Sequence, residues 1–156
     1  MKIGHIGIKW YQVVNMFIGQ YTHHLEEKGR LSVPKKFRAE LAEGAILSQG
    51  LDGCLFLYAR RVWEQLISKV SQLPLTQSDA RSFTRSLSYA AVEVDIDRLG
   101  RILIPEHLRA YAGLKTDCVV AGAVDRVEIW DQAKFSVYIQ KITSQAETIA
   151  EKLVLT

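Results

Sequence analysis

The fold of this chain is decided by the stretch Leu25-Glu26-Glu27-Lys28-Gly29-Arg30-Leu31-Ser32-Val33-Pro34-Lys35-Lys36-Phe37-Arg38, which recurs 71 residues later as Ile96-Asp97-Arg98-Leu99-Gly100-Arg101-Ile102-Leu103-Ile104-Pro105-Glu106-His107-Leu108-Arg109. The match continues after one inserted residue in the second copy. There Gly50, Leu57-Tyr58 and Trp63 correspond to Gly122, Ile129-Trp130 and Phe135. A match this long indicates a duplicated unit. Because each copy has only about 45 to 50 residues, the copies should share a core with each other or with neighbouring subunits.

Each copy has the pattern of two short strands joined by a tight turn and followed by a helix. An acidic residue precedes a glycine that can take a positive φ, and an apolar-x-apolar strand follows, with its apolar side chains on one sheet face. The proline after that strand suits the first position of a helix, since its missing N–H costs nothing there. We expect these prolines, Pro34 and Pro105, to open short helices that end before Gly44 and Gly113.

The pattern predicts an α+β fold with small, strongly twisted, hairpin-linked sheets. Between the copies, apolar residues at helical spacing predict two helices, separated at Leu73-Pro74, with a capping signal at Thr76 to Asp79. Asp131 to about Lys152 is expected to form a final helix. The resulting division is an N-terminal extension at 1–15, a first unit at 20–66, a helical linker at 67–91, a second unit at 92–135 and a C-terminal helix at 136–156.

Composition excludes some classes of protein and leaves others open. The hydrophobic content of 48% supports a packed core, and a formal charge of +3 permits nucleic-acid binding without requiring it. Cys54 and Cys118 are far apart, which favours buried, reduced thiols over a disulfide or zinc framework. Residues 1–15 have no signal-peptide pattern, and no segment has the roughly 20 apolar residues of a membrane span. We therefore expect a cytoplasmic protein without a membrane partner.

The motifs resemble those of the MraZ family, whose units are SpoVT/AbrB-like. The resemblance is carried by Met16-Phe17-Ile18-Gly19-Gln20-Tyr21, by Lys28 to Pro34, by Gly100 to Pro105 and by Glu128-Ile129-Trp130-Asp131. It covers nearly all of the chain from Met16 onward, so residues 1–15 lie outside the family pattern and Met16 is a possible alternative start. The family's D-x-x-x-R motif maps onto Asp97 to Arg101, whereas the first copy departs from it with Glu26 before Arg30.

The resemblance implies both an architecture and a function. Members are similar in having tandem swapped-hairpin β-barrel units and in forming closed, ring-shaped homo-oligomers, here expected to be octamer-like. They bind repeated boxes in the promoter of their own division and cell-wall gene cluster. The expectation is therefore a nucleoid-associated transcriptional repressor whose partner is double-stranded promoter DNA.

The residues themselves offer a mechanism for reading DNA. An arginine beyond a tight glycine turn can project a planar fork of donors towards guanine or a phosphate. The acid four positions earlier can orient that arginine or brace the turn, and the alternative is an ordinary intramolecular salt bridge. The first copy carries its cations without an acid from Lys28 to Arg38, so we expect Arg30 with Lys28 to make the main contacts and Arg101 to have a secondary or structural part. The candidate DNA-binding residues are Lys28, Arg30, Lys35, Lys36, Arg38 and Arg101, supported at the turns by Glu26, Gly29, Asp97 and Gly100.

Other functions find less support in the sequence. No complete catalytic set, nucleophile signature, metal motif or cofactor motif can be assembled, so neither an enzyme nor a metal or cofactor site is expected. Adjacent His23 and His24 suit one metal poorly, and Asp95-x-Asp97 is best read as solvated acids before a turn. Trp63 and Trp130 are expected in the core rather than as base-stacking platforms. The alternative that stays open is an antitoxin-type interaction module without a primary DNA function.

Overall fold

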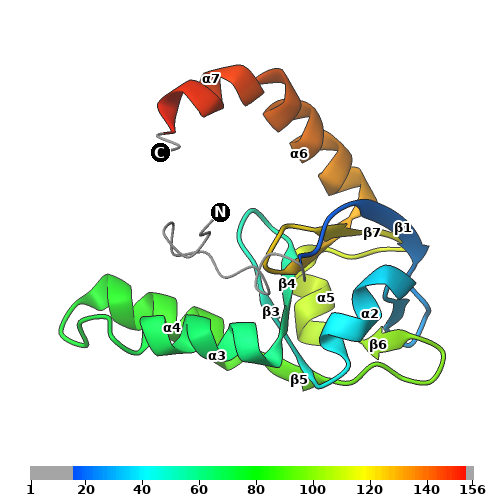
Figure 1. The fold of residues 1–156 in the computed structure, drawn as a ribbon, viewed down its shortest axis with the longest axis horizontal. Coiled ribbons are helices and arrows are strands. Elements are labelled where there is room, and N and C mark those ends of the chain that lie inside the picture. The colour runs from blue at the N-terminus through cyan, green and yellow to red at the C-terminus, as the bar shows by residue number, and fades with distance from the viewer. Residues whose placement is uncertain (1–15, 154–156) are drawn as a thin grey trace, which may run out of the picture.

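The computed structural model describes residues 16–153 and confirms the duplicated α+β architecture (Figure 1). The first copy runs through β1 (Gln20–His24), β2 (Arg30–Ser32), α2 (Lys35–Leu41), β3 (Ala45–Gln49), β4 (Leu55–Ala59) and α3 (Arg60–Val70). After α4 (Ser78–Ala90), the second copy repeats this order as β5 (Val92–Val94), β6 (Arg101–Leu103), α5 (Glu106–Ala112), β7 (Asp117–Gly122), β8 (Val127–Asp131) and α6 (Gln132–Ser144), followed by α7 (Ala146–Lys152).

The two copies exchange strands. A six-stranded sheet has the order β1-β7-β8-β4-β3-β5, and a separate two-stranded ribbon joins β2 to β6. Thus β1 of the first copy pairs with β7 of the second, and β5 of the second pairs with β3 of the first, all antiparallel. Each copy therefore supplies a strand that pairs with a strand of the other copy, which is the swapped-hairpin arrangement. The ladders among residues 16–153 give an open order with β1 and β5 at its ends.

The register shows that the copies are related by an approximate twofold axis. In the ribbon, Leu31 lies opposite Ile102, its equivalent in the repeat. In the sheet, Phe56 lies opposite Glu128, again an equivalent pair. An operation that exchanges the copies must map each of these pairs onto itself, so the axis passes through both.

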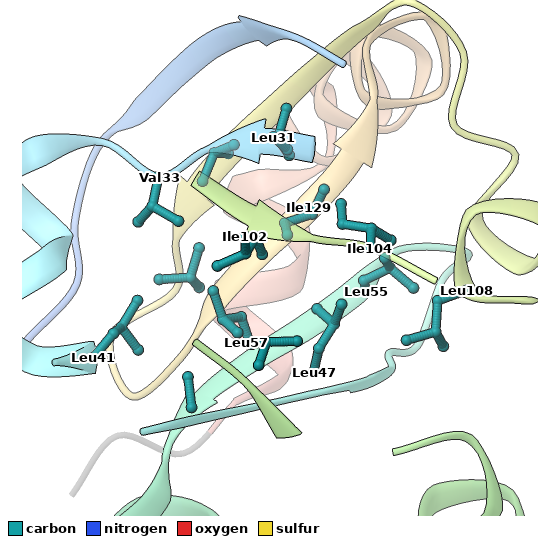
Figure 2. Close-up of a cluster of buried hydrophobic side chains, with 14 of the residues drawn as sticks. Leu31, Val33, Leu41, Leu47, Leu55, Leu57, Ile102, Ile104, Leu108 and Ile129 are labelled. Carbon is teal, nitrogen blue, oxygen red and sulfur yellow. The ribbon is translucent and has the colours of Figure 1, made fainter. Parts of the chain in front are cut away.

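Residues of both copies form one core. Leu31, Ile102, Leu57 and Ile129 are each at most 1% exposed and belong to the same cluster. Figure 2 shows these side chains meeting between the β2–β6 ribbon and the larger sheet. The prediction that the copies share a core is confirmed, because neither could bury these residues alone.

A second cluster covers another part of the sheet. It contains Cys54, Phe56, Tyr58, Val119 and Trp130, against which residues of α3 and α6 pack. Trp130 is 3% exposed and stacks on Tyr138 with ring centroids 5.0 Å apart, which confirms its predicted place in the core.

Some helix boundaries differ from the prediction. Pro34 and Pro105 are N-caps with ψ of 135° and 154°, so the helices begin one residue later, at Lys35 and Glu106. The reason is that each proline keeps the extended ψ of the strand while its carbonyl accepts a bond from the helix's first turn, at 2.8 Å from Phe37 N and 3.1 Å from Leu108 N. The expected end at Gly113 is confirmed, since Gly113 is a left-handed C-cap with φ of +60°.

The inserted segment and the C-terminal segment are helical as expected, with two corrections. Gln77 is the N-cap of α4 and makes no side-chain cap bond, so the capping signal predicted at Thr76 to Asp79 does not cap the helix through a side chain. The final helix is two helices, because Gln145 leaves helical geometry with ψ of 4°. In Figure 1 the α3–α4 pair extends to one side of the strands and α6–α7 arches above them. No helix within residues 16–153 combines the length and apolarity needed to cross a membrane.

Candidate nucleic-acid interface

The β2–β6 ribbon has an apolar inner face and a partly charged outer face. Leu31 and Ile102 point into the core at 1% exposure each. Because side chains alternate along a strand, the flanking residues point the opposite way. The outer face therefore carries Arg30 and Ser32 from β2, and Arg101 and Leu103 from β6.

The turns that lead into this ribbon have the same geometry in both copies. Gly29 and Gly100 have φ of +91° and +80°, a region that L side chains rarely adopt. The Gly29 N–H donates to the Glu26 carbonyl at 2.8 Å, and the Gly100 N–H donates to the Asp97 carbonyl at 2.9 Å. The sequence predicts these tight glycine turns correctly.

Each turn is locked by the other copy. The Val33 N–H donates to the Gly100 carbonyl, and the Ile104 N–H donates to the Gly29 carbonyl, both at 2.8 Å. A Cβ at Gly100 would overlap the Arg38 guanidinium, so that side chain lies directly against the turn. Arg38 Nε also donates to the Val33 carbonyl at 2.9 Å. The structure thus places Arg38, a candidate DNA-binding residue, where it supports the turn of the second copy.

Asp97 braces its own turn and its own arginine. One carboxylate oxygen accepts the N–H groups of Leu99 and Arg101 at 2.9 Å each, and the other accepts Arg101 Nε at 3.0 Å. The backbone hydrogen bond from Arg101 is the main cause that lowers the pKa of Asp97, aided by the Arg101 side chain and the Leu99 N–H. In the second copy, Asp97 therefore both braces the turn and forms a salt bridge with Arg101.

Glu26, which stands where the family's motif has Asp, makes different contacts from Asp97. Its two carboxylate oxygens lie 3.2 and 2.9 Å from Arg101 Nη1, across the ribbon, rather than beside Arg30. This hydrogen bond is the largest cause that raises the pKa of Arg101, whose side chain is 23% exposed. A contact between residues 75 positions apart has no local sequence signal, so sequence reasoning missed it.

The other candidate DNA-binding side chains lie on the first copy and have no acidic partner within residues 16–153. Arg30 is partly exposed and has no ion pair or side-chain hydrogen bond with any other residue of 16–153. Lys28 is exposed just before β2, and Lys35 and Lys36 are exposed in the first turn of α2, which contains no acid. The equivalents of Lys35 and Lys36 in α5 are Glu106 and His107, so the cationic side of the interlocked unit is that of the first copy.

The described part of the chain contains neither a reactive thiol nor a cluster of metal ligands. Burial raises the pKa of the Cys54 and Cys118 thiols to about 12, which leaves both protonated and unreactive, as predicted for buried thiols. Within 16–153, no three side chains of His, Cys, Asp or Glu gather as a metal site. His5, Trp10 and the remainder of the 1–15 extension lie outside the described residues, as do Val154 and Leu155.

Two interleaved copies of a strand–glycine-turn–strand–helix unit define this chain as a tandem-repeat α+β protein whose copies exchange strands. The model of the MraZ protein family, described also as antitoxin-like, matches residues 16–86 and again residues 87–156. The chain belongs to the MraZ family.

Curated relatives agree with this assignment. Three proteins named "Transcriptional regulator MraZ" are similar to the chain. The one from Acetivibrio thermocellus is 46% identical over 140 residues, covering 90% of this chain and 98% of the relative. Those from Heliobacterium modesticaldum and Natranaerobius thermophilus are 45% and 46% identical over 139 residues, covering 89% of this chain and 97% of each relative. The family is thus one of transcriptional regulators, which is not a class of enzymes.

Proposed function

We propose that this chain is a sequence-specific repressor that reads double-stranded promoter DNA through its first hairpin. The observation that carries the proposal is Arg30, which lies on the outer face of a two-stranded ribbon with no acidic partner in residues 16–153. A two-stranded β-ribbon fits the major groove, where an arginine fork can bond guanine O6 and N7 together. The names of the relatives support a role in transcription.

The charges around Arg30 support a division of labour. Lys28, Lys35 and Lys36 are exposed point charges suited to phosphates, which fix the register of a protein on a duplex. Arg38 and Arg101 are engaged within the protein, against Gly100 and with two carboxylates. In this proposal Arg30 specifies bases, the three lysines position the backbone, and the other two arginines hold the hairpins.

The wider regulatory role is proposed from family membership. The chain forms a ring-shaped, octamer-like homo-oligomer that binds repeated boxes upstream of its own division and cell-wall gene cluster, in the nucleoid. Several subunits on one DNA raise the effective concentration for each later contact, which turns modest single contacts into tight binding. Half a helical turn inserted between boxes should therefore weaken binding.

An antitoxin-type function is the second candidate, favoured by the antitoxin-like description of the family model. In that case the chain would hold one protein partner in fixed stoichiometry. A pull-down that yields such a partner and no DNA would favour this candidate over the repressor.

The test is footprinting followed by gel-shift titration on the DNA upstream of the chain's own gene. Arg30→Ala should weaken binding roughly tenfold or more, the loss typical of one bidentate base contact. Arg85→Ala is the matched control, because Arg85 is an exposed arginine on α4, outside the ribbon. Equal affinity of Arg30→Ala and the wild-type chain for the footprinted box would contradict the proposed reading residue, and the absence of any footprint would contradict the function.

A further inference from the structure

The two halves of the ribbon are nearly symmetric in backbone but not in the state of their arginines. Arg30 lies opposite Leu103 and Arg101 lies opposite Ser32, positions that the approximate twofold axis exchanges. If both arginines were free, the ribbon would offer the same reading group twice, in opposite directions. The side-chain contacts show that it does not.

The contacts of Arg101 occupy both edges of its guanidinium. A guanidinium can present two donors in parallel through Nη1 with Nη2, or through Nε with Nη2. Asp97 takes Nε at 3.0 Å, and Glu26 takes Nη1 at 2.9 and 3.2 Å. Either edge therefore has one of its two donors already bonded, and two carboxylates surround one cation.

Asp97 alone would leave Arg101 usable. It bonds Nε and the turn backbone, which orients the side chain while keeping the Nη1–Nη2 edge free. Glu26 engages Nη1, one of the two donor atoms of that edge, because the first turn lies beside the second across the interlocked unit. Asp97 makes no reciprocal bond to Arg30: the hydrogen bonds that its two oxygens accept come from Leu99 and Arg101 of its own turn.

We propose that Glu26 withholds Arg101 from DNA, so that the nearly symmetric ribbon presents one reading arginine and recognises an asymmetric site in a fixed orientation. Glu26 is thus a residue that determines specificity by acting through Arg101. The inference rests on the proposed function, which it deepens by stating why one protomer reads one direction of the duplex.

The first experiment needs no DNA. Phenylglyoxal, which condenses with accessible guanidinium groups, is added to the full chain, and adducts are mapped by mass spectrometry over time. Arg30 should react several-fold faster than Arg101 in the wild-type chain, and Glu26→Ala should raise the rate at Arg101. Glu27→Ala is the matched control, because Glu27 is the exposed neighbouring acid and has no ion pair with another residue of 16–153. An Arg101 that reacts as fast as Arg30 in the wild-type chain overturns the proposal.

The second experiment measures orientation on DNA. Two duplexes are titrated, one with the footprinted box and one in which the half of the box nearest Arg30 is repeated in inverted orientation to make it dyad-symmetric. The wild-type chain and Glu27→Ala should bind the symmetric duplex no more tightly than the native one. Glu26→Ala should prefer the symmetric duplex roughly tenfold, the gain of one added bidentate contact.

A double variant separates release of Arg101 from any other effect of removing Glu26. Glu26→Ala/Arg101→Ala should lose the preference for the symmetric duplex, since the gain belongs to the pair. If the wild-type chain binds DNA and Glu26→Ala behaves like Glu27→Ala, this inference fails and the proposed function stands. If the wild-type chain binds no DNA at all, the proposed function fails and the inference fails with it.

Discussion

Leu31 lies directly opposite Ile102 at the centre of the β2–β6 ribbon, so the same position of the repeat meets itself across the approximate twofold axis. Each side chain is 1% exposed and packs into the core that the two copies share. Leu31 and Ile102 therefore hold the inner face of the ribbon against the core, while the candidate DNA-reading residues lie on its outer face.

Leu31→Ala should lower the free energy of unfolding by about 2–5 kcal/mol, the usual cost of a cavity at a buried leucine. Leu103→Ala is the control, because Leu103 belongs to the same ribbon but is 49% exposed on its outer face. Its effect should stay within about 0.5 kcal/mol, as for most surface substitutions. Denaturant unfolding measures both, and equal losses would show that the ribbon is not anchored through its inner face.

Gly100→Ala should cost more than Gly53→Ala, although both glycines have positive φ, of +80° and +85°. The backbone strain of about 1–2 kcal/mol is common to both. Only at Gly100 would the added methyl group collide with a side chain, that of Arg38, whereas nothing lies within 4 Å at Gly53. The difference in unfolding free energy between the two variants isolates that packing, and a difference near zero would mean that Arg38 moves aside freely.

Asp97→Asn should destabilise the chain at neutral pH, and the deficit should shrink in acid. A carboxyl whose pKa is lowered on folding contributes stability that is present above its unfolded pKa, about 3.9, and is lost as the pH falls through the folded value. Unfolding curves of the wild-type chain and Asp97→Asn should therefore converge below about pH 4. Asp95→Asn, two residues earlier on the exposed surface, serves as the control. A deficit that stays constant down to pH 2 would assign the effect to shape rather than charge.

Lys36→Ala should weaken DNA binding without changing which sequence is preferred. Loss of one phosphate contact lowers the slope of log affinity against log salt by about 0.9. Lys141→Ala, an exposed lysine near the end of α6, should leave the slope unchanged. Altered preference among mutated boxes in Lys36→Ala would instead indicate a base contact.

Cys54 and Cys118 should resist alkylation by iodoacetamide in the folded chain. With pKa values raised to about 12 by burial, the reactive thiolate is scarce at pH 8. Both thiols should become reactive together in denaturant, which mass spectrometry can follow. Rapid labelling of either cysteine under native conditions would contradict its burial.

The sequence predicts the features that depend on local pattern or on repetition. Gly29 and Gly100 mark the turns, Leu31 and Ile102 mark the buried face of the ribbon, and the duplication indicates a shared core. All of these follow from the period of the pattern and the backbone freedom of glycine. Whether Pro34 begins the helix or caps it depends on one ψ angle, which composition does not determine.

The parts of the site that sequence could not provide are contacts between the copies. Arg38 belongs to the first copy by sequence but supports Gly100 of the second, and Glu26 bonds Arg101 instead of Arg30. An acid four residues before an arginine favours a local pair, and only the exchange of strands makes the distant arginine the nearer one. The interlocked topology, rather than any motif, assigns these partners.

The exchange of β1 and β5 between the two halves has a consequence at low protein concentration. Halves made of separate chains would come apart on dilution by mass action, and each would lose the strand that it borrows. Here one polypeptide supplies both, so the β2–β6 ribbon stays assembled at any protein concentration.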